Sequence, residues 1–313
     1  MRVFILISLF LTTIGFAEKE VQPLSGTLDS FINVRDFTAF KNEAYFTAQD
    51  AHERRTIMVK AQSVNGRWRD FEKVPFSGLY RDIEPFLSPD GLRLYFASNR
   101  PVTGIRPSSH YDIWYVHRSN PESPWSEPIH LPGPVNTESN EFYPAVTANN
   151  NLYFTSDRHN DKRKDDIYMS PWVNGQYQPA RALSDNINSP GYEFNAYVAA
   201  DESFLIYTIY AAEDGLGSGD LYISYRQSDG DFGPRVNLGP SINSDKMDYC
   251  PFYDGSQQRL IWTSKRSAIG DTKLPDVTTF IKTTQQYENG FSRLYQSPFV
   301  VDSAATQSNA QLP

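Results

Sequence analysis

The sequence predicts an all-β fold, a five-bladed β-propeller of four-stranded antiparallel blades. The first observation is a unit that recurs five times. Its central strand is marked by Tyr45, Tyr95, Tyr153, Ile206 and Ile261, at steps of 50, 58, 53 and 55 residues. A repeat of this length indicates a stack or ring of equivalent units.

The second observation is that each unit contains four short strand-like segments separated by turn signals. In the second unit, residues 82–87, 92–98, 111–116 and 125–131 are the expected strands. The turn between the first two is Ser-Pro-Asp-Gly at residues 88–91, with Pro and Gly where a tight turn needs them. Four antiparallel strands in such a unit are typical of one propeller blade. No segment has a convincing 3.6-residue period, so we expect almost no helix.

The repeats divide the chain into a signal peptide, a propeller and a tail. Residues 1–17 are basic and then apolar, and end in a small-x-small cleavage site, which is typical of a secretory signal peptide cleaved after Ala17. We expect the propeller over residues 18–300 and a disordered tail over residues 301–313. The expected blades span roughly residues 31–78, 79–134, 135–186, 187–241 and 242–300.

Two segments compete for the last strand of the fifth blade. Residues 21–26 are similar to the fourth strands of other blades, so we infer that they pair with the last blade and close the ring. The alternative uses residues 291–299 as the fourth strand of that blade, and the two arrangements are compatible. Ring closure removes exposed sheet edges.

The signal peptide indicates where the protein is located, and the charge composition argues against one class of partner. The signal peptide predicts a periplasmic or secreted monomer with no stable membrane insertion after cleavage. Cys250 is the only cysteine, so the chain forms no internal disulfide. The net charge of −8 comes from interspersed acidic and basic residues, which argues against nucleic acid as a partner.

Three stretches of the second unit resemble a known repeat. These are Glu-Pro-Phe-Leu-Ser-Pro-Asp-Gly at residues 84–91, Leu-Tyr-Phe-Ala-Ser-Asn-Arg at 94–100 and Asp-Ile-Trp at 112–114. They resemble the WD-like β-propeller repeat of TolB-type proteins, over nearly the whole mature chain. The resemblance implies an exported, stand-alone propeller. It implies little about function, because the extra domains that carry the functions of that family have no counterpart here.

A repeated carboxylate is the candidate site. Glu141, Glu193 and Asp248 each follow, by five residues, the Asn of a blade-to-blade connection, and Asp82 holds the equivalent place in the second repeat. The first repeat offers Asn33 or Asp36. Long loops between second and third strands share a face with these connections, so we expect the carboxylates to ring the channel mouth on that loop-rich face.

Such a ring would suit a cationic or polyhydroxylated ligand, or a hard cation such as Ca²⁺, and no other cofactor is predicted. The neighbouring aromatic and basic residues would complete the site. The candidate ligand-binding residues are therefore Asp82, Glu141, Glu193, Asp248, Tyr143, Tyr192, Tyr249 and Arg81. In the alternative interpretation, a residue repeated in every blade belongs to the internal hydrogen bonding of the blade.

Two further pairs are expected to be structural. Arg100 with Asp112, and Arg158 with Asp166, would meet at the ends of adjacent strands and hold the base of a long loop.

The leading functional prediction is a non-catalytic exported propeller that binds a protein partner or a cell-envelope glycan through its loop-rich face. It depends on the absence of a serine-hydrolase elbow, a phosphate loop and metal-spaced histidines. The alternative is a glycoside-active enzyme that uses the channel-mouth carboxylates. Their near equivalence weighs against this, since an acid and a nucleophile need different environments. A third possibility is Ca²⁺ bound in the channel for structural reasons.

Overall fold

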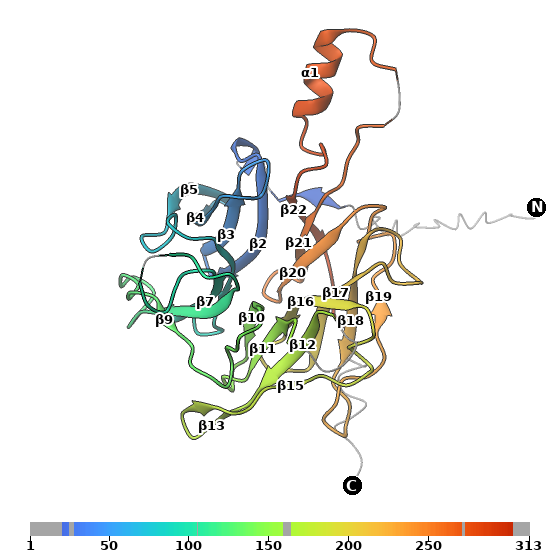
Figure 1. Ribbon diagram of the computed structural model, residues 1–313. Coiled ribbons are helices and arrows are strands. Elements are labelled where there is room, and N and C mark those ends of the chain that lie inside the picture. The colour runs from blue at the N-terminus through green and yellow to red at the C-terminus, as the bar shows by residue number, and fades with distance from the viewer. Residues whose placement is uncertain (1–20, 25–27, 105, 159–163, 271–272, 303–313) are drawn as a thin grey trace, which may run out of the picture.

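The computed structural model is a five-bladed β-propeller, which confirms the predicted fold (Figure 1). It describes residues 21–24, 28–104, 106–158, 164–270 and 273–302. The predicted signal peptide and most of the predicted tail lie outside the described residues.

Within blades 1 to 4 the strands pair antiparallel in sequence order, from the propeller axis outward. Blade 1 consists of β2 (Asn33–Phe40), β3 (Glu43–Gln49), β4 (Thr56–Val64) and β5 (Arg67–Lys73). Blade 2 consists of β6 (Asp82–Leu87), β7 (Arg93–Ser98), β8 (Asp112–His117) and β9 (Ile129–His130). Blade 3 consists of β10 (Glu141–Val146), β11 (Leu152–Ser156), β12 (Asp166–Ser170) and β15 (Arg181–Ala182). Blade 4 consists of β16 (Tyr192–Val198), β17 (Phe204–Tyr210), β18 (Gly219–Tyr225) and β19 (Val236–Asn237). The innermost strands β2, β6, β10, β16 and β20 contact their neighbours around the axis.

Blade 5 takes one strand from the start of the chain. It consists of β20 (Asp248–Asp254), β21 (Arg259–Ser264), β22 (Arg293–Pro298) and β1 (Gln22–Pro23). In β1, Gln22 pairs with Gln296 and Pro23 with Tyr295. The inferred closure by the N-terminal segment is confirmed. The alternative is wrong, because β22 is the third strand of this blade and not the fourth.

Two insertions depart from the repeat. A helix, α1 (Val277–Gln285), lies in the connection between β21 and β22 and projects from the ring (Figure 1). It contains no buried residue, and its N-terminus is capped by Asp276, whose side chain accepts from the amide of Thr279. The expectation of almost no helix missed it because nine residues give too short a window for a periodic signal. Among the described residues no helix is long and apolar enough to cross a membrane.

The second insertion is a two-stranded hairpin in blade 3, made of β13 (Trp172–Val173) and β14 (Gln176–Tyr177). Its turn is the Asn-Gly pair at residues 174–175, a strong hairpin signal in the sequence.

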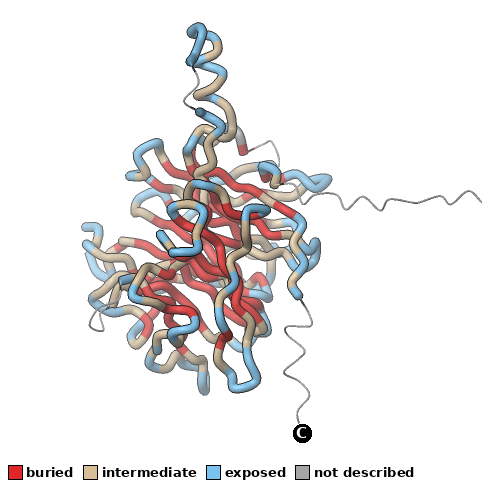
Figure 2. The backbone as a smooth tube through the Cα atoms, turned by 90° about the vertical axis from the view of Figure 1, so that its right-hand side faces the viewer, coloured by how far each residue is buried: buried red, intermediate tan, exposed pale blue. Residues whose placement is uncertain are grey.

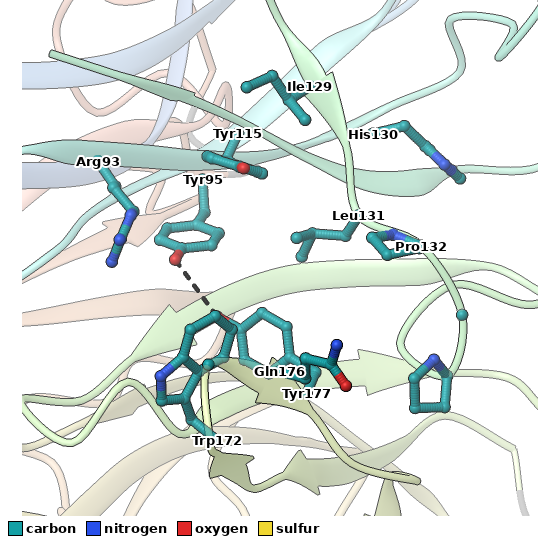
Figure 3. Close-up of a pocket in the computed structure, with 13 residues that line it drawn as sticks. Arg93, Tyr95, Tyr115, Ile129, His130, Leu131, Pro132, Trp172, Gln176 and Tyr177 are labelled. Atoms are coloured by element: carbon teal, nitrogen blue, oxygen red, sulfur yellow. Dashed lines mark hydrogen bonds between the residues drawn. The ribbon is translucent and has the colours of Figure 1, made fainter.

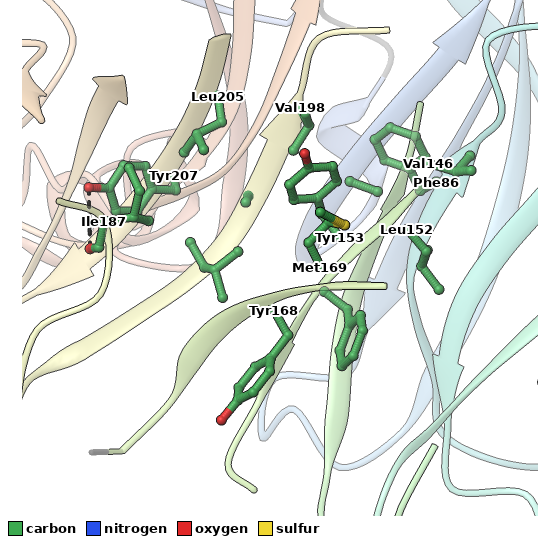
Figure 4. Close-up of a cluster of buried hydrophobic side chains, with 14 of the residues drawn as sticks. Phe86, Val146, Leu152, Tyr153, Tyr168, Met169, Ile187, Val198, Leu205 and Tyr207 are labelled. Atoms are coloured by element: carbon green, nitrogen blue, oxygen red, sulfur yellow. Dashed lines mark hydrogen bonds between the residues drawn. The ribbon is translucent and has the colours of Figure 1, made fainter. Parts of the chain in front are cut away.

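The repeated aromatic strands form the core between the blades (Figure 2). Tyr45 and Tyr153 are fully buried and Tyr95 is almost so. Figure 4 shows one such cluster, where Phe86 of blade 2, Tyr153 of blade 3 and Tyr207 of blade 4 belong to one continuous packed group. The repeated central strand is therefore a packing element and not a binding element.

Every innermost strand has a β-bulge at the same place. The register with the second strand shifts there, and a non-glycine residue adopts a left-handed backbone. These five bulge residues are Asp36 (φ 63°), Glu84 (φ 60°), Tyr143 (φ 44°), Asn195 (φ 56°) and Cys250 (φ 52°). Such strain is uncommon away from glycine and concentrates at functional sites.

Candidate active site

The four predicted carboxylates lie inside the blades. Asp82, Glu141, Glu193 and Asp248 have no exposed surface. Each is held by its own blade: Asp82 accepts from Arg100, and Glu141 accepts from Thr137. The other two bind in the same way, Glu193 to Ser189 and Asp248 to Ser244. These contacts support the structural interpretation. The expectation that the four groups ring an open channel mouth differs from the structure.

The register also corrects the first repeat. Counted from the bulge, the residue equivalent to Asp82 is Val34 of β2, which is neither Asn33 nor Asp36. Blade 1 therefore has no carboxylate at this position. Asp36 lies two positions further on, at the bulge itself.

The two predicted ion pairs are rearranged. Arg100 Nη2 donates to Asp82 Oδ1 at 2.6 Å, so the Arg100–Asp112 pair is wrong; Asp112 Oδ2 instead contacts His130 Nε2 at 2.8 Å. Arg158 Nη2 likewise reaches the first strand of its own blade, at Glu141 Oε1, 2.9 Å away. For Asp166, the structure places the carboxylate at the start of β12, where it is buried. Arg100 and Arg158 thus neutralise Asp82 and Glu141, two of the residues predicted to bind a ligand.

A cavity of about 380 Å³ lies on the axis at the loop-rich face. The residue just before each bulge contributes to its wall, so all five blades line it. These five residues are Arg35, Ile83, Phe142, Phe194 and Tyr249. The remaining lining residues are Glu53, Arg81, Glu84, Tyr111, Thr155, Asp165, Asn195, Met247 and Lys265.

Three of the predicted aromatic and basic residues gather at this axial cavity. Arg81 and Tyr249 line it, and Tyr143 occupies a bulge beneath it. Tyr192 is elsewhere, packed edge-on against Tyr210 with a ring-centre distance of 6.0 Å.

Arg35 joins two buried carboxyl groups at the floor of the cavity. Its Nε donates to Asp36 Oδ1 at 2.6 Å and its Nη2 donates to Glu84 Oε1 at 2.7 Å. The amide of Glu84 also donates to Asp36 Oδ2, at 3.2 Å. Asp36 and Glu84 are 1% and 5% exposed, so neither carboxyl group is solvated like a surface acid. Of the two, only Glu84 reaches the cavity wall.

The second carboxyl oxygen of Glu84 accepts a hydrogen bond because one blade lacks a threonine that three other blades provide. The amides of the bulge residues Asp36, Glu84 and Asn195 each donate, at 3.2 Å, to a threonine in the second strand of the preceding blade. The threonine position of blade 2 is Ala97, which has no hydroxyl. The amide of Tyr143 therefore donates to Glu84 Oε2, at 2.8 Å.

The surroundings give the carboxyl groups different acidities. Burial raises the pKa of Glu84 to about 7, against the opposing effect of Arg35. Burial and the nearby Asp157 raise the pKa of Asp165 above its usual value. For Glu53, burial is outweighed by Lys265 Nζ, 2.8 Å away, and the pKa is lowered. Glu84 is thus a carboxyl group that holds a proton close to neutral pH.

Cys250 completes the floor as a hydrogen-bond donor. Its Sγ lies 2.8 Å from Asp36 Oδ1, and burial, followed by Asp36, raises the pKa of the thiol. The side chain therefore stabilises Asp36 and has no thiolate character. Within the described ranges, no group of three or more His, Cys, Asp or Glu could hold a metal ion. The Ca²⁺ hypothesis stays a prediction.

Solved structures share this fold at low sequence identity. An α-L-arabinofuranosidase from Lactobacillus brevis is 14% identical, with 91% of this chain and 94% of that chain covered and a TM-score of 0.52. An α-L-arabinofuranosidase from Podospora anserina is 11% identical, with 90% and 96% covered and a TM-score of 0.52. A GH43_1 enzyme from Xanthomonas citri, solved with xylotriose, is 12% identical, with 92% of each chain covered and a TM-score of 0.52. No protein-family model and no curated protein matches the chain, so the resemblance to TolB-type repeats stays a prediction.

These comparisons correct the functional prediction. They count against the leading prediction of a non-catalytic binding propeller and favour the glycosidase alternative, because two of these structures are α-L-arabinofuranosidases and the third is an enzyme solved with xylotriose. At these identities the similarity itself establishes the fold alone.

Proposed function

We propose that this protein hydrolyses a glycosidic bond in the axial cavity, with Glu84 as the proton donor. The observation that carries the proposal is the buried pair of carboxyl groups, Asp36 and Glu84, bridged by Arg35 at the cavity floor. Glycoside hydrolysis needs one carboxyl group that keeps its proton and a second that stays a carboxylate. Glu84 is the candidate for the first role, and Asp36, which does not reach the cavity wall, holds Arg35 in place beside it.

Glu84 is placed to act on the leaving group. Its carboxyl group reaches the cavity, and the raised pKa keeps it protonated near neutral pH. Donation of that proton to the glycosidic oxygen would let the bond to the anomeric carbon break. Asp36 and Arg35 act as positioning residues, since they orient Glu84 from below.

Asp165 is the candidate for activating water. Three carboxyl groups line the cavity: Glu53 pairs with Lys265, and Glu84 is the proposed proton donor. The third, Asp165, has no ion pair with any described residue. In this assignment Asp165 accepts the proton of the water that attacks the anomeric carbon. The balance is one water consumed and one glycosidic bond converted into two hydroxyl groups.

The walls suit a sugar. Tyr111, Phe142 and Phe194 offer aromatic faces for stacking on the apolar side of a sugar ring, and Arg81 and Asn195 offer hydrogen-bond donors. The fold neighbours act on arabinosides or were solved with xylo-oligosaccharides. We therefore take pentose-containing glycans as the first substrates to test.

The test is hydrolysis by the purified chain of a panel that contains aryl α-L-arabinofuranosides, aryl β-D-xylosides and arabinoxylan oligosaccharides. We expect turnover of at least one substrate, reduced in Glu84→Gln and kept in Glu122→Gln, a control at an exposed loop position. Inactivity across the panel, or unchanged turnover in Glu84→Gln, would contradict the proposal.

A further inference from the structure

A cluster of charged and aromatic side chains, here called the plug, fills the boundary between blades 1 and 2. It consists of Arg118, Glu43 and Trp125. Arg118, just after β8, donates to Glu43 of blade 1 at 2.7 Å and to the carbonyl of Gly91 at 2.9 Å. Its guanidinium group stacks 4.2 Å from the ring centre of Trp125, whose Nε1 donates to the hydroxyl of Tyr45 at 2.9 Å. One arginine, one glutamate and one aromatic ring thus fill the groove beside the tyrosine of the preceding blade.

The boundary between blades 3 and 4 repeats this plug. Arg226 donates to Glu202, to the hydroxyl of Tyr153 at 2.8 Å and to the carbonyl of Glu202 at 3.1 Å. Its guanidinium group lies 4.2 Å from the ring centre of Phe232. Arg118 and Arg226 stand at the same place, six residues after the aspartates Asp112 and Asp220 of their third strands.

Blade 3 breaks the pattern. Six residues after Asp166 the chain has Trp172, not arginine. The position of Glu43, two residues before the strand tyrosine, is taken in blade 2 by Arg93. Neither member of the acid–base pair is present at this boundary. The hairpin β13–β14 instead brings Tyr177, whose hydroxyl lies 3.3 Å from that of Tyr95.

The result is an open groove of about 480 Å³ between blades 2 and 3. Figure 3 shows Tyr95 and Tyr115 of blade 2 facing Trp172 and Tyr177 of the hairpin. None of its lining residues lines the axial cavity. We name it the interblade groove.

The residues that line the interblade groove favour some classes of ligand over others. Aromatic rings come from both sides: Tyr95 stacks on Tyr115 with ring centres 5.7 Å apart, and Trp172 packs edge-on against Tyr177 at 4.7 Å. None of the described lining residues is Asp or Glu, so no carboxylate in the groove would pair with a cationic ligand. One N–H group of Arg93 donates to the side chain of Asn150 at 3.0 Å, and the guanidinium group has other N–H groups that can donate to a ligand.

We propose that the interblade groove binds a neutral oligosaccharide. Its rings would stack on Trp172 and Tyr177, and its hydroxyl groups would accept from Arg93 and exchange hydrogen bonds with Gln176. Arg93 and Gln176 have planar, multiply hydrogen-bonding ends, which suit the adjacent hydroxyl groups of a sugar chain. This binding goes beyond the proposed hydrolysis and holds whether or not Glu84 cleaves the ligand.

The test is calorimetric titration of the full chain carrying Glu84→Gln, so that no turnover consumes the ligand. The probes are xylohexaose, cellohexaose and arabinohexaose, with decaproline as the probe for a proline-rich peptide. We expect binding of at least one hexasaccharide, weakened about tenfold or more by Trp172→Ala, since an aromatic stacking contact is lost. Tyr210→Ala, an exposed tyrosine outside the groove, is the matched control and should bind as the parent does.

A second variant closes the groove instead of opening it. Trp172→Arg with Arg93→Glu rebuilds the Arg118–Glu43 plug next to Tyr95, and should abolish hexasaccharide binding while thermal unfolding shows an intact fold. If this variant does not fold, Gln176→Ala, at an exposed hairpin position, should weaken binding severalfold. Binding of decaproline alone, no binding of any hexasaccharide, or equal binding in the parent and in the folded groove variants would overturn the proposal. If the wild-type chain hydrolyses none of the substrates but the groove still binds a hexasaccharide, the result would count against the proposed hydrolysis only.

Discussion

At the bulge of each innermost strand, one residue decides what the propeller axis can do. The fold repeats the left-handed backbone five times, but the side chains placed there are all different: Asp36, Glu84, Tyr143, Asn195 and Cys250. Two neighbouring blades supply acids, and Arg35 fixes them together. The chemistry therefore comes from what differs among the repeats.

The sharpest residue-scale prediction concerns Glu84. Glu84→Gln keeps the size of the side chain but cannot donate a catalytic proton. We expect kcat to fall by about 10²–10⁴ on a substrate with a poor leaving group. A smaller loss on an aryl glycoside with a good leaving group would confirm the role of proton donor. Equal losses on both substrates would contradict it.

A second prediction concerns the position of Glu84. In Ala97→Thr the new hydroxyl group would compete for the amide of Tyr143, as threonines do in the other blades. We expect kcat to drop and the activity profile to shift along the pH axis, because Glu84 loses a hydrogen bond, while thermal unfolding stays near that of the wild type. Ala51→Thr, in an exposed turn, is the control. An unchanged pH profile would leave Ala97 without a role.

The carboxylates inside the blades lead to the opposite expectation. Asp82→Asn leaves the guanidinium group of Arg100 buried without its anion, which should cost about 3–5 kcal/mol of unfolding free energy. Chemical denaturation measures this, and the folded fraction should retain its turnover per molecule. Lost turnover with unchanged stability would return Asp82 to the candidate ligand-binding residues.

At the scale of elements, the N-terminal strand β1 is short but closes the ring. Leu24, directly after it, is 1% exposed and belongs to the core of blades 1 and 5. Leu24→Ala should lower the unfolding free energy by about 2–5 kcal/mol, because it leaves a cavity where the ring closes. Leu79→Ala, at a leucine that is 82% exposed, should change it little. Equal effects in the two variants would show that closure does not depend on this strand.

The two insertions show where element prediction stops. The hairpin β13–β14 could be located from its Asn-Gly turn. The interblade groove beside it forms because Trp172 occupies a position that is arginine in blades 2 and 4. That comparison needs the strand register, which the loops of unequal length obscure in the sequence. Helix α1 carries an apolar stripe of Val277, Phe280 and Ile281, but it spans only nine residues, which is too short for a periodic pattern to stand out in the sequence.

For the whole molecule, burial of Glu84 links stability to pH. Its pKa is about 7 in the folded protein and near 4.5 when unfolded. The raised value means that the proton is held more tightly in the folded state, so this contribution to stability is complete below about pH 4.5 and is lost as the pH rises through 7. The difference in unfolding free energy between wild type and Glu84→Gln should therefore change across this range. A difference independent of pH would show that Glu84 ionises normally.

The amino-acid sequence was enough to predict the all-β class, the five repeats, most of the blade strands and the N-terminal closure, because turn chemistry and aromatic strand patterns are local. It also located a carboxylate near the start of the inner strand in four of the five blades, and left open whether that acid binds a ligand. The three-dimensional structure was needed to show that these acids lie inside the blades, and that the pair bridged by Arg35 sits two positions later. A β-bulge changes which way a side chain points, and the partners of Glu84 come from blades 1 and 3, 49 and 59 residues away in the chain.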